Sequence, residues 1–187
     1  FTGNFRQELK LADNSIHITG QAADGTEVKL QVWVDAFQSI VHVNGEASRP
    51  VSVKAAVEML SGAQGSLDGD AALWHFRIDG PSPQRRDLIA KNHIEKIADA
   101  VPDPMENHTW GGRLTGEGFV AAGSGEAENE GQRTTAFGIA TKEAVRKFDV
   151  QATLRIAQDP SLEVWKRELA ALEASGRQNA AADREKT

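Results

Sequence analysis

The stretch EVKLQVWVDAFQSIVHVN, residues 27–44, constrains the fold most, because its apolar and polar side chains alternate strictly. The even-numbered residues from Val28 to Val34 are all aliphatic, whereas the odd-numbered ones from Lys29 to Asp35 are polar or aromatic. A period of two is typical of a half-buried β-strand. After a short break, the run from Ile40 to Val43 begins a second strand, so we expect an antiparallel hairpin or a bent connection here.

Other runs of β-forming residues flank this pair on both sides. They cover residues 5–11, 16–18, 51–59, 73–78, 110–121, 134–141 and 147–157. Asp24-Gly25 is a good hairpin turn, and Asn44-Gly45 with Pro50 predicts another turn. We predict exposed loops at 61–70 and 123–132. Many strands joined by short turns favour an antiparallel β-sandwich over a parallel sheet.

Two segments have helical rather than strand spacing. The first predicts a short helix near residues 85–100, ended by Pro102 and Pro104. The second begins at Asp159-Pro160, a good N-cap followed by a good first helical residue, and Gly176 is a suitable terminator. Its apolar positions form one stripe along a helix, namely Leu162, Trp165, Leu169 and Leu172. We therefore divide the chain into a β-sandwich domain, 1–158, and a linker helix with a tail, 159–187.

Composition limits the classes of partner. The chain has 187 residues, enough for one domain or a domain with an extension, and no cysteine. A net charge of −6 argues against nucleic acid as a partner, since nucleic-acid sites are basic. No apolar run approaches the roughly 20 residues that span a bilayer, so we expect no membrane partner. No signal peptide is evident, but the sequence opens at Phe1 without Met, which leaves the compartment open.

The residues alone do not predict a reaction, a cofactor or a metal site. None of the histidines has HxH or HExxH spacing; they are His17, His42, His75, His93 and His108. No GxSxG, P-loop or GxGxxG motif lies in a strand-turn-helix context. Asp35, at the end of the alternating strand, and Glu117, between glycines, are candidate catalytic carboxylates, but we favour a turn acceptor for Asp35 and a solvated side chain for Glu117.

The segment NHTWGGRLTGEG, residues 107–118, is the most unusual in composition. It combines large polar and aromatic side chains with four glycines, a mixture that suits sugar recognition by ring stacking and hydrogen bonds. The candidate carbohydrate-binding residues are His108, Trp110, Arg113 and Glu117. In the alternative interpretation, Trp110 fills the core of a kinked strand and Arg113 pairs at its edge. We expect Trp33 and Trp74 to be core or interface residues.

Five segments taken in order resemble a known type of domain. They are VWVDAFQSIVHV, PVSVKAAVEML, LWHFRI, DPMENHTWGGRLTGEGF and VQATLRIAQDPSLEVWKREL. The order resembles the supersandwich-like N-terminal β-sandwich that precedes an α/α six-hairpin barrel in fucosidase-like glycoside hydrolases and their uncharacterised relatives. The resemblance spans roughly residues 5–172. It departs from the family pattern where a Gly- and Trp-rich opening is missing and where residues 85–100 read as helical.

The resemblance implies a role for this chain without implying a catalytic residue. In that family the catalytic acid and base lie in the barrel, so none can be transferred to this sequence. A linker helix would place the stripe from Leu162 to Leu172 at a domain interface, and a large exposed apolar patch would mark where the barrel docks. A secreted or periplasmic location follows from the resemblance alone.

Three functional hypotheses result. The first is a non-catalytic N-terminal accessory domain of a glycoside hydrolase, which supports a catalytic barrel and helps to shape its carbohydrate cleft. The second is a free-standing carbohydrate-binding module whose site includes His108, Trp110 and Arg113. The third is a structural domain without a ligand, expected if the side chain of Trp110 is wholly buried.

Overall fold

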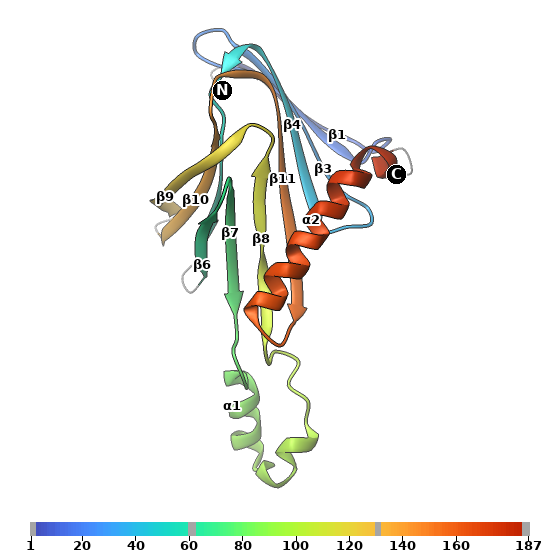
Figure 1. Cartoon of the computed structure of the whole chain (residues 1–187), viewed down its shortest axis with the longest axis vertical. Helices are drawn as coiled ribbons and strands as arrows, with labels where there is room; N and C mark the ends of the chain where they lie inside the picture. The colour runs from blue at the N-terminus through green and yellow to red at the C-terminus, as the bar shows by residue number, and fades with distance from the viewer. Residues whose placement is uncertain (1–2, 60–62, 130–131, 185–187) are drawn as a thin grey trace.

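A computed structural model describes residues 3–59, 63–129 and 132–184 and confirms the prediction of a mainly β, antiparallel sandwich. A large sheet of eight strands lies against a small sheet of three strands, and one long helix packs on the outer face of the large sheet (Figure 1). The predicted loops at 61–70 and 123–132 and the predicted tail fall partly outside the described residues.

All the neighbouring strands pair antiparallel. The large sheet has the order β1 (Gly3–Lys10), β2 (Ser15–Gln21), β3 (Glu27–Val34), β4 (Ile40–Val51), β11 (Val145–Gln158), β8 (His108–Gly116), β7 (Ala71–Arg77) and β6 (Gln64–Asp68). The small sheet has the order β5 (Lys54–Met59), β10 (Gln132–Thr141) and β9 (Phe119–Asn129).

The hairpin predicted from the alternating stretch is confirmed as β3 and β4. Val32 lies opposite Val43, and Gln31 lies opposite Asn44, so aliphatic and polar pairs occupy opposite faces. The turn predicted at Asp24-Gly25 is also present, since Gly25 has a positive φ of 81° between β2 and β3. Where they pair, β3 and β4 therefore have one aliphatic face and one largely polar face.

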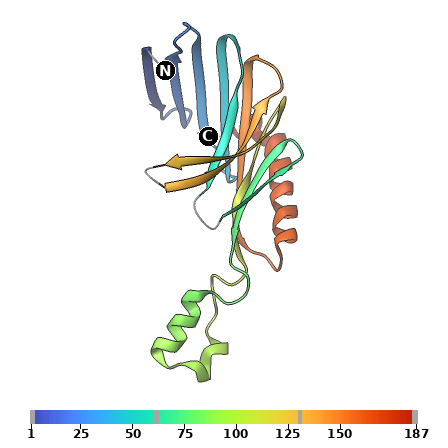
Figure 2. The same cartoon turned by 90° about the vertical axis from the view of Figure 1, so that its left-hand side faces the viewer.

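The main core lies between the two sheets. Its fully packed members come from five different strands or their ends, namely Ala72, Leu114, Phe119, Ile139 and Val150. The small sheet does not extend over the whole large sheet: β1, β2 and β3 stand beyond its edge in Figure 2. Apolar side chains on those strands stay exposed as a result, with Phe5 59% and Leu9 66% exposed.

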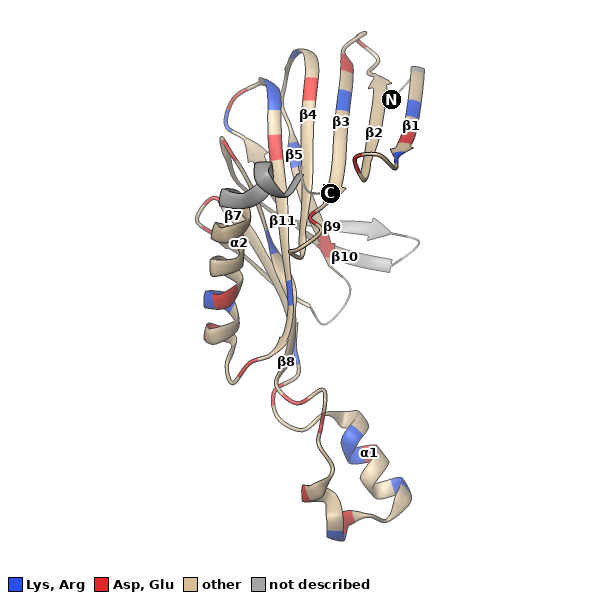
Figure 3. Ribbon diagram, turned by 90° about the vertical axis from the view of Figure 1, so that its right-hand side faces the viewer, with Lys and Arg blue, Asp and Glu red and all other residues tan. Residues whose placement is uncertain are grey.

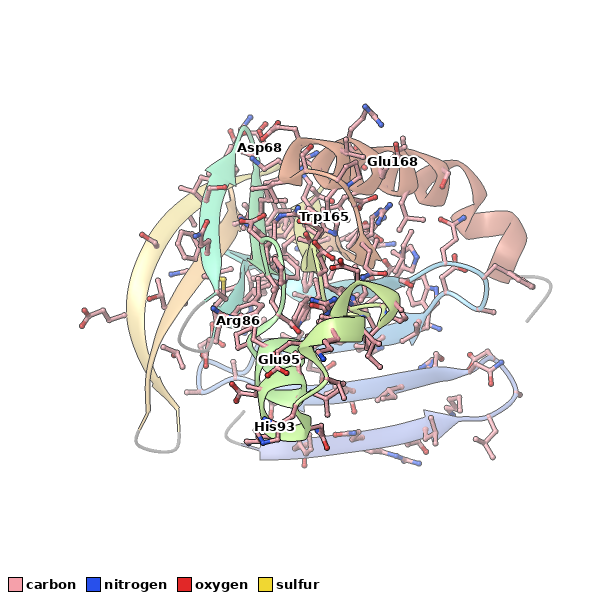
Figure 4. All side chains as sticks on the ribbon, turned by 90° about the horizontal axis from the view of Figure 1, so that it is seen from below. Asp68, Arg86, His93, Glu95, Trp165 and Glu168 are labelled. Carbon is pink, nitrogen blue, oxygen red and sulfur yellow. The ribbon has the colours of Figure 1, made fainter. Side chains whose placement is uncertain are left out.

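Helix α2 (Leu162–Arg184) covers part of the opposite face of the large sheet. Trp165 and Leu169 are buried completely or almost completely and form a second core with Leu73 of β7. Figure 4, a view from below, shows Trp165 between α2 and the sheet. The apolar stripe of the helix is thus used for packing on the sheet of its own chain.

The predicted ends of this helix are wrong. The helix begins at Leu162, and the hydroxyl of Ser161 accepts a hydrogen bond from the Val164 N–H at 3.3 Å, as an N-cap does. Asp159 forms an ion pair with Arg155 at 3.0 Å instead. Gly176 lies inside the helix, at a point where a Cβ atom would overlap the side chain of Ile40. This glycine therefore allows the helix to pack closely on Ile40 and does not end the helix.

The short helix predicted near 85–100 is present in two pieces. Helix α1 (Pro83–Asn92) ends at His93, which has a left-handed φ of 52°, and a 3-10 helix, η1 (Glu95–Ala100), follows. The Ser82 hydroxyl caps α1 by accepting from the Arg85 N–H at 3.1 Å. These pieces belong to an arm, residues 79–107, that projects from the ends of β7 and β8 (Figures 1 and 2).

Three further sequence-based predictions are corrected. Asn44 and Gly45 lie inside β4 rather than in a turn, because the ring of Phe148 packs where a Cβ of residue 45 would stand. The predicted loop at 123–132 is largely a hairpin, in which β9 and β10 pair from Phe119↔Thr141 to Gln132↔Asn129. Strand β6 likewise occupies five of the ten residues of the loop predicted at 61–70. Both segments are rich in glycine and polar residues, a composition typical of loops, although parts of each form strands here.

Candidate functional sites

The four residues predicted to form a sugar site do not all lie together. Strand β8 places His108 and Trp110 on the face toward the small sheet, and it places Arg113 on the face covered by α2. The positions of Trp110 and Arg113 differ by an odd number, so their side chains point to opposite faces of an extended strand. Glu117 lies in the turn after β8, away from both.

Trp110 lines an open groove of about 530 Å³ beyond the edge of the small sheet, which we call the aromatic groove. Its ring lies 4.8 Å from that of Phe76 and 5.0 Å from that of His108, measured between centroids. The other side chains of the lining are mostly apolar, namely Val57, Glu58, Met59, Ala63, Trp74, His75, Leu154 and Ile156. Trp110 is half-buried and Ile156 is 71% exposed, so apolar side chains next to the core are accessible to solvent here.

Arg113 is engaged in ion pairs that hold secondary-structure elements together. Its guanidinium lies 3.2 Å from the Glu173 carboxylate of α2 and 3.4 Å from the Asp68 carboxylate of β6. Glu173 is 6% exposed, and a carboxylate that is buried to this extent requires a partner. Arg113 therefore ties the helix to the edge of the sheet.

Glu117 lines a second groove, of about 660 Å³, on the face of the large sheet that carries α2. We call it the polar groove, and its polar side chains are His17, Lys29, Gln31, Asn44, Glu46, Glu117, Lys147 and Asp149. Leu30, Phe148, Gly45 and Gly118 complete the lining. Charges of both signs follow β3, β4 and β11 in this region (Figure 3).

The register of the strands arranges these polar side chains in two rows. His17, Gln31, Asn44 and Asp149 lie opposite one another in turn across β2, β3, β4 and β11. Lys29, Glu46 and Lys147 form the next row. The polar residues of the alternating stretch are the signal in the sequence that could have indicated this groove, which is absent from the sequence-based predictions above.

Asp35 is confirmed as a turn acceptor. Its Oδ1 accepts hydrogen bonds from the N–H groups of Phe37 at 2.8 Å and Gln38 at 3.0 Å, in the connection between β3 and β4.

Within residues 3–59, 63–129 and 132–184, no three His, Cys, Asp or Glu side chains lie close enough together to hold a metal ion. In the same part of the chain, no helix is long and apolar enough to span a membrane.

A carboxyl group of the arm and an imidazole of β7 have shifted pKa values. Burial tends to raise the pKa of Asp103, but hydrogen bonds from the N–H groups of Ser82 and Met105 and from the Ser82 hydroxyl outweigh it, so the pKa is lowered. The same hydrogen bonds join the two ends of the arm at Asp103 and Ser82.

His75 on β7 also has a shifted pKa. Burial, with the charges of Lys166 and Arg77, lowers the pKa of His75 despite the opposing charge of Asp79.

The family described as a domain of unknown function, DUF5703 (N-terminal part), matches residues 1–74 and 70–187, which together span the chain. The chain belongs to the DUF5703 family. No curated protein matches its sequence.

Solved structures resemble this DUF5703 domain in fold. One is a candidate kojibiose phosphorylase from the human microbiome, with a TM-score of 0.50 and 10% sequence identity. The similarity covers 98% of this chain but only 24% of the phosphorylase. At this identity the match concerns the fold alone, and the DUF5703 domain spans about a quarter of that larger protein.

Three of the four stripe residues predicted at a domain interface, Leu162, Trp165 and Leu169, pack with Leu73 and Ala157 of the DUF5703 domain's own sheet. Trp165 and Leu169 are buried there, and Leu162 and Leu172 are half-buried. A role for this stripe toward a following domain stays a prediction. The exposed apolar side chains lie elsewhere, at the aromatic groove, on the outer strands and on the arm, where Ile97 is 56% exposed.

Proposed function

We propose that this chain is a non-catalytic N-terminal accessory domain of a carbohydrate-active enzyme, in which it supports a catalytic barrel. The observation that favours this role is the coverage of the structural match: almost all of this chain corresponds to about a quarter of a much longer protein. The resemblance of the sequence to domains that precede α/α barrels points to the same arrangement. Fucosidase-like activity of the attached barrel is part of the proposal.

The distribution of apolar surface supports the same role. Monomeric proteins rarely expose large contiguous apolar patches, and those that exist are often interaction sites. Here the aromatic groove ends in Ile156 and Leu154, which are 71% and 37% exposed. The arm starts from the same end of the sheet and exposes Leu88 and Ile97. We propose that the catalytic barrel covers this end of the domain.

The test of the accessory role is a turnover assay on the isolated chain. Aryl glycosides with different sugars are supplied with and without inorganic phosphate, and aryl alcohol release is followed. We expect no release above the background, because a glycosidase needs a facing pair of carboxyl groups and the proposal assigns that pair to the barrel. Sustained hydrolysis or phosphorolysis by the isolated chain would refute the proposal.

A carbohydrate-binding module is the second candidate, and the position of Trp110 favours it. A wholly buried Trp110 would have favoured a domain without a ligand, but Trp110 is only half-buried, and the ring of His108 lies beside it. In this case Trp110→Ala abolishes binding of plant or microbial glycans to the isolated chain. Phe37→Ala, which removes an aromatic ring that is 68% exposed outside the groove, is the matched control. Equal binding by the two variants excludes a site at Trp110.

A further inference from the structure

The polar groove differs from an ordinary solvated sheet face, because its side chains are aligned and partly held in place. His17 Nε2 lies 2.9 Å from the Ser15 hydroxyl, and Gln31 Nε2 donates to the same oxygen at 3.2 Å. Ser15 is 1% exposed. Two groove side chains are thus positioned by one buried hydroxyl, and such preorganisation lowers the entropy cost of binding a ligand.

Asn44 gives a second indication of a binding site. It lies in the middle of the first polar row, between Gln31 and Asp149. Its Oδ1 atom is buried and has no hydrogen-bond partner among the described residues. A buried acceptor without a partner costs free energy, so an atom of this kind in a groove is suited to a donor from a ligand.

The side chains of the groove limit the chemistry of that ligand. Two lysines and three carboxylates nearly cancel in charge, which does not suit a phosphate or a nucleic acid. No group of ligands for a metal ion is present among the described residues. Only Leu30 and Phe148 are apolar in the lining, so an apolar protein surface is not a suitable partner.

Donors and acceptors alternate instead, as a ligand with several hydroxyl groups requires. Lys29 and Lys147 are donors, Glu46, Glu117 and Asp149 are acceptors, and the amides of Gln31 and Asn44 are both. Three inter-strand spacings of about 4.8 Å make the first row about 14 Å long, which suits an elongated ligand. The volume of about 660 Å³ lies in the range of small-molecule sites.

We infer that the polar groove binds an uncharged, polyhydroxylated ligand of the oligosaccharide class. Asn44 and Gln31 lie at the centre of this site and Glu117 at its end. The choice of oligosaccharides among polyhydroxylated ligands rests on the proposed function, whereas the site itself consists of residues of this chain alone.

Calorimetric titration of the isolated chain tests the inference. The probes are cellotriose, maltotriose and xylotriose, with inorganic phosphate as an anionic comparison. We expect at least one trisaccharide to bind, and Asn44→Ala to weaken that binding about tenfold, as expected for the loss of one buried hydrogen bond. Glu117→Gln should weaken it about threefold, since one acceptor loses its charge at an exposed position. Glu95→Gln, an exposed change on the arm, should have no effect.

Thermal unfolding of each variant separates loss of binding from loss of folding. If Asn44→Ala does not fold, Gln31→Ala takes its place, with the same expected loss. The inference is overturned if none of the trisaccharides binds at up to about 20 mM, if phosphate alone binds, or if binding survives both groove substitutions unchanged. Such a result would leave the accessory role intact, because that role is tested by turnover and not by this groove.

Discussion

The two grooves lie on opposite faces of the same eight-stranded sheet, and they differ in almost every property. The aromatic groove begins where the small sheet stops covering β7 and β8, and its lining continues the hydrophobic core. The polar groove lies on the face that carries α2, over β2, β3, β4 and β11, and its lining is charged or amide-bearing. A period of two along each strand is enough to produce both surfaces from the same segments.

The comparison shows which surface requires another protein and which does not. An apolar groove with exposed aliphatic side chains is costly in water until another layer covers it. A polar groove is stable in water and becomes useful only when a ligand exchanges hydrogen bonds with it. We therefore assign the first to a neighbouring domain and the second to a small molecule, as proposals that can be tested separately.

The same substitution on the two faces should have different consequences for stability. Trp165→Ala removes a side chain that is 0% exposed between α2 and β7, and it should lower the free energy of unfolding by about 3–5 kcal/mol. Trp110→Ala removes a half-buried ring from the aromatic groove and should cost about 1–2 kcal/mol. Chemical denaturation measures both values. Equal losses would contradict the burial difference between the faces.

Substitution of Arg77 should have the next largest effect on stability, because this residue joins the arm, β8 and the start of α2. Its guanidinium donates to the Asn107 carbonyl at 3.0 Å, the Thr109 hydroxyl at 2.7 Å and the Asp159 carbonyl at 3.2 Å. Arg77→Ala should destabilise the fold by about 2–3 kcal/mol, since these buried acceptors lose a charged donor. Arg86→Ala, at an exposed position of α1 labelled in Figure 4, is the matched control and should stay within about 0.5 kcal/mol. A similar loss of unfolding free energy in both variants would show that the hydrogen bonds of Arg77 do not stabilise the fold.

His75 makes the helix-bearing face sensitive to pH. Burial lowers its pKa below the ordinary value of 6.5, and its ring lies 6.1 Å from that of Trp165. Just below pH 6.5 the unfolded chain binds more protons than the folded chain, so the free energy of unfolding should decrease as the pH decreases, by at most about 1.4 kcal/mol per pH unit. His75→Gln should flatten this dependence in denaturation curves measured between about pH 7 and 5. An unchanged slope would contradict the prediction.

Substitution of Ile156 should have the smallest effect on the stability of this domain and a large effect on its association with the catalytic barrel. Because its side chain is 71% exposed, Ile156→Lys should change the free energy of unfolding by less than about 0.5 kcal/mol. In a protein that also contains the catalytic barrel, the same change should weaken packing of the barrel on this domain, seen as faster limited proteolysis between the two. Proteolysis at the unchanged rate would place the docking surface elsewhere.

Alternation along the strands was sufficient to predict the sandwich and the central hairpin, because a period of two depends only on local sequence. The arm was predicted only as a helix, since its projection depends on contacts such as Ser82 with Asp103 that join distant residues. The placement of Trp110 and Arg113 on opposite faces could have been predicted, because residues 110–121 read as a strand and the two positions differ by an odd number. The polar groove requires the register of four strands, which no single segment contains.

The four tryptophans provide the most direct test of the assignment of the two faces. Trp33 stacks on His42 at 4.8 Å in the row of residues next to the polar groove, whereas Trp74 and Trp110 line the aromatic groove. Indole N–H signals in NMR spectra therefore report on each face during a titration with cellotriose, maltotriose or xylotriose. We predict that the Trp33 signal shifts while those of Trp74 and Trp110 stay in place. A shift of Trp110 with Trp33 unchanged would contradict the account and place the ligand on the other face.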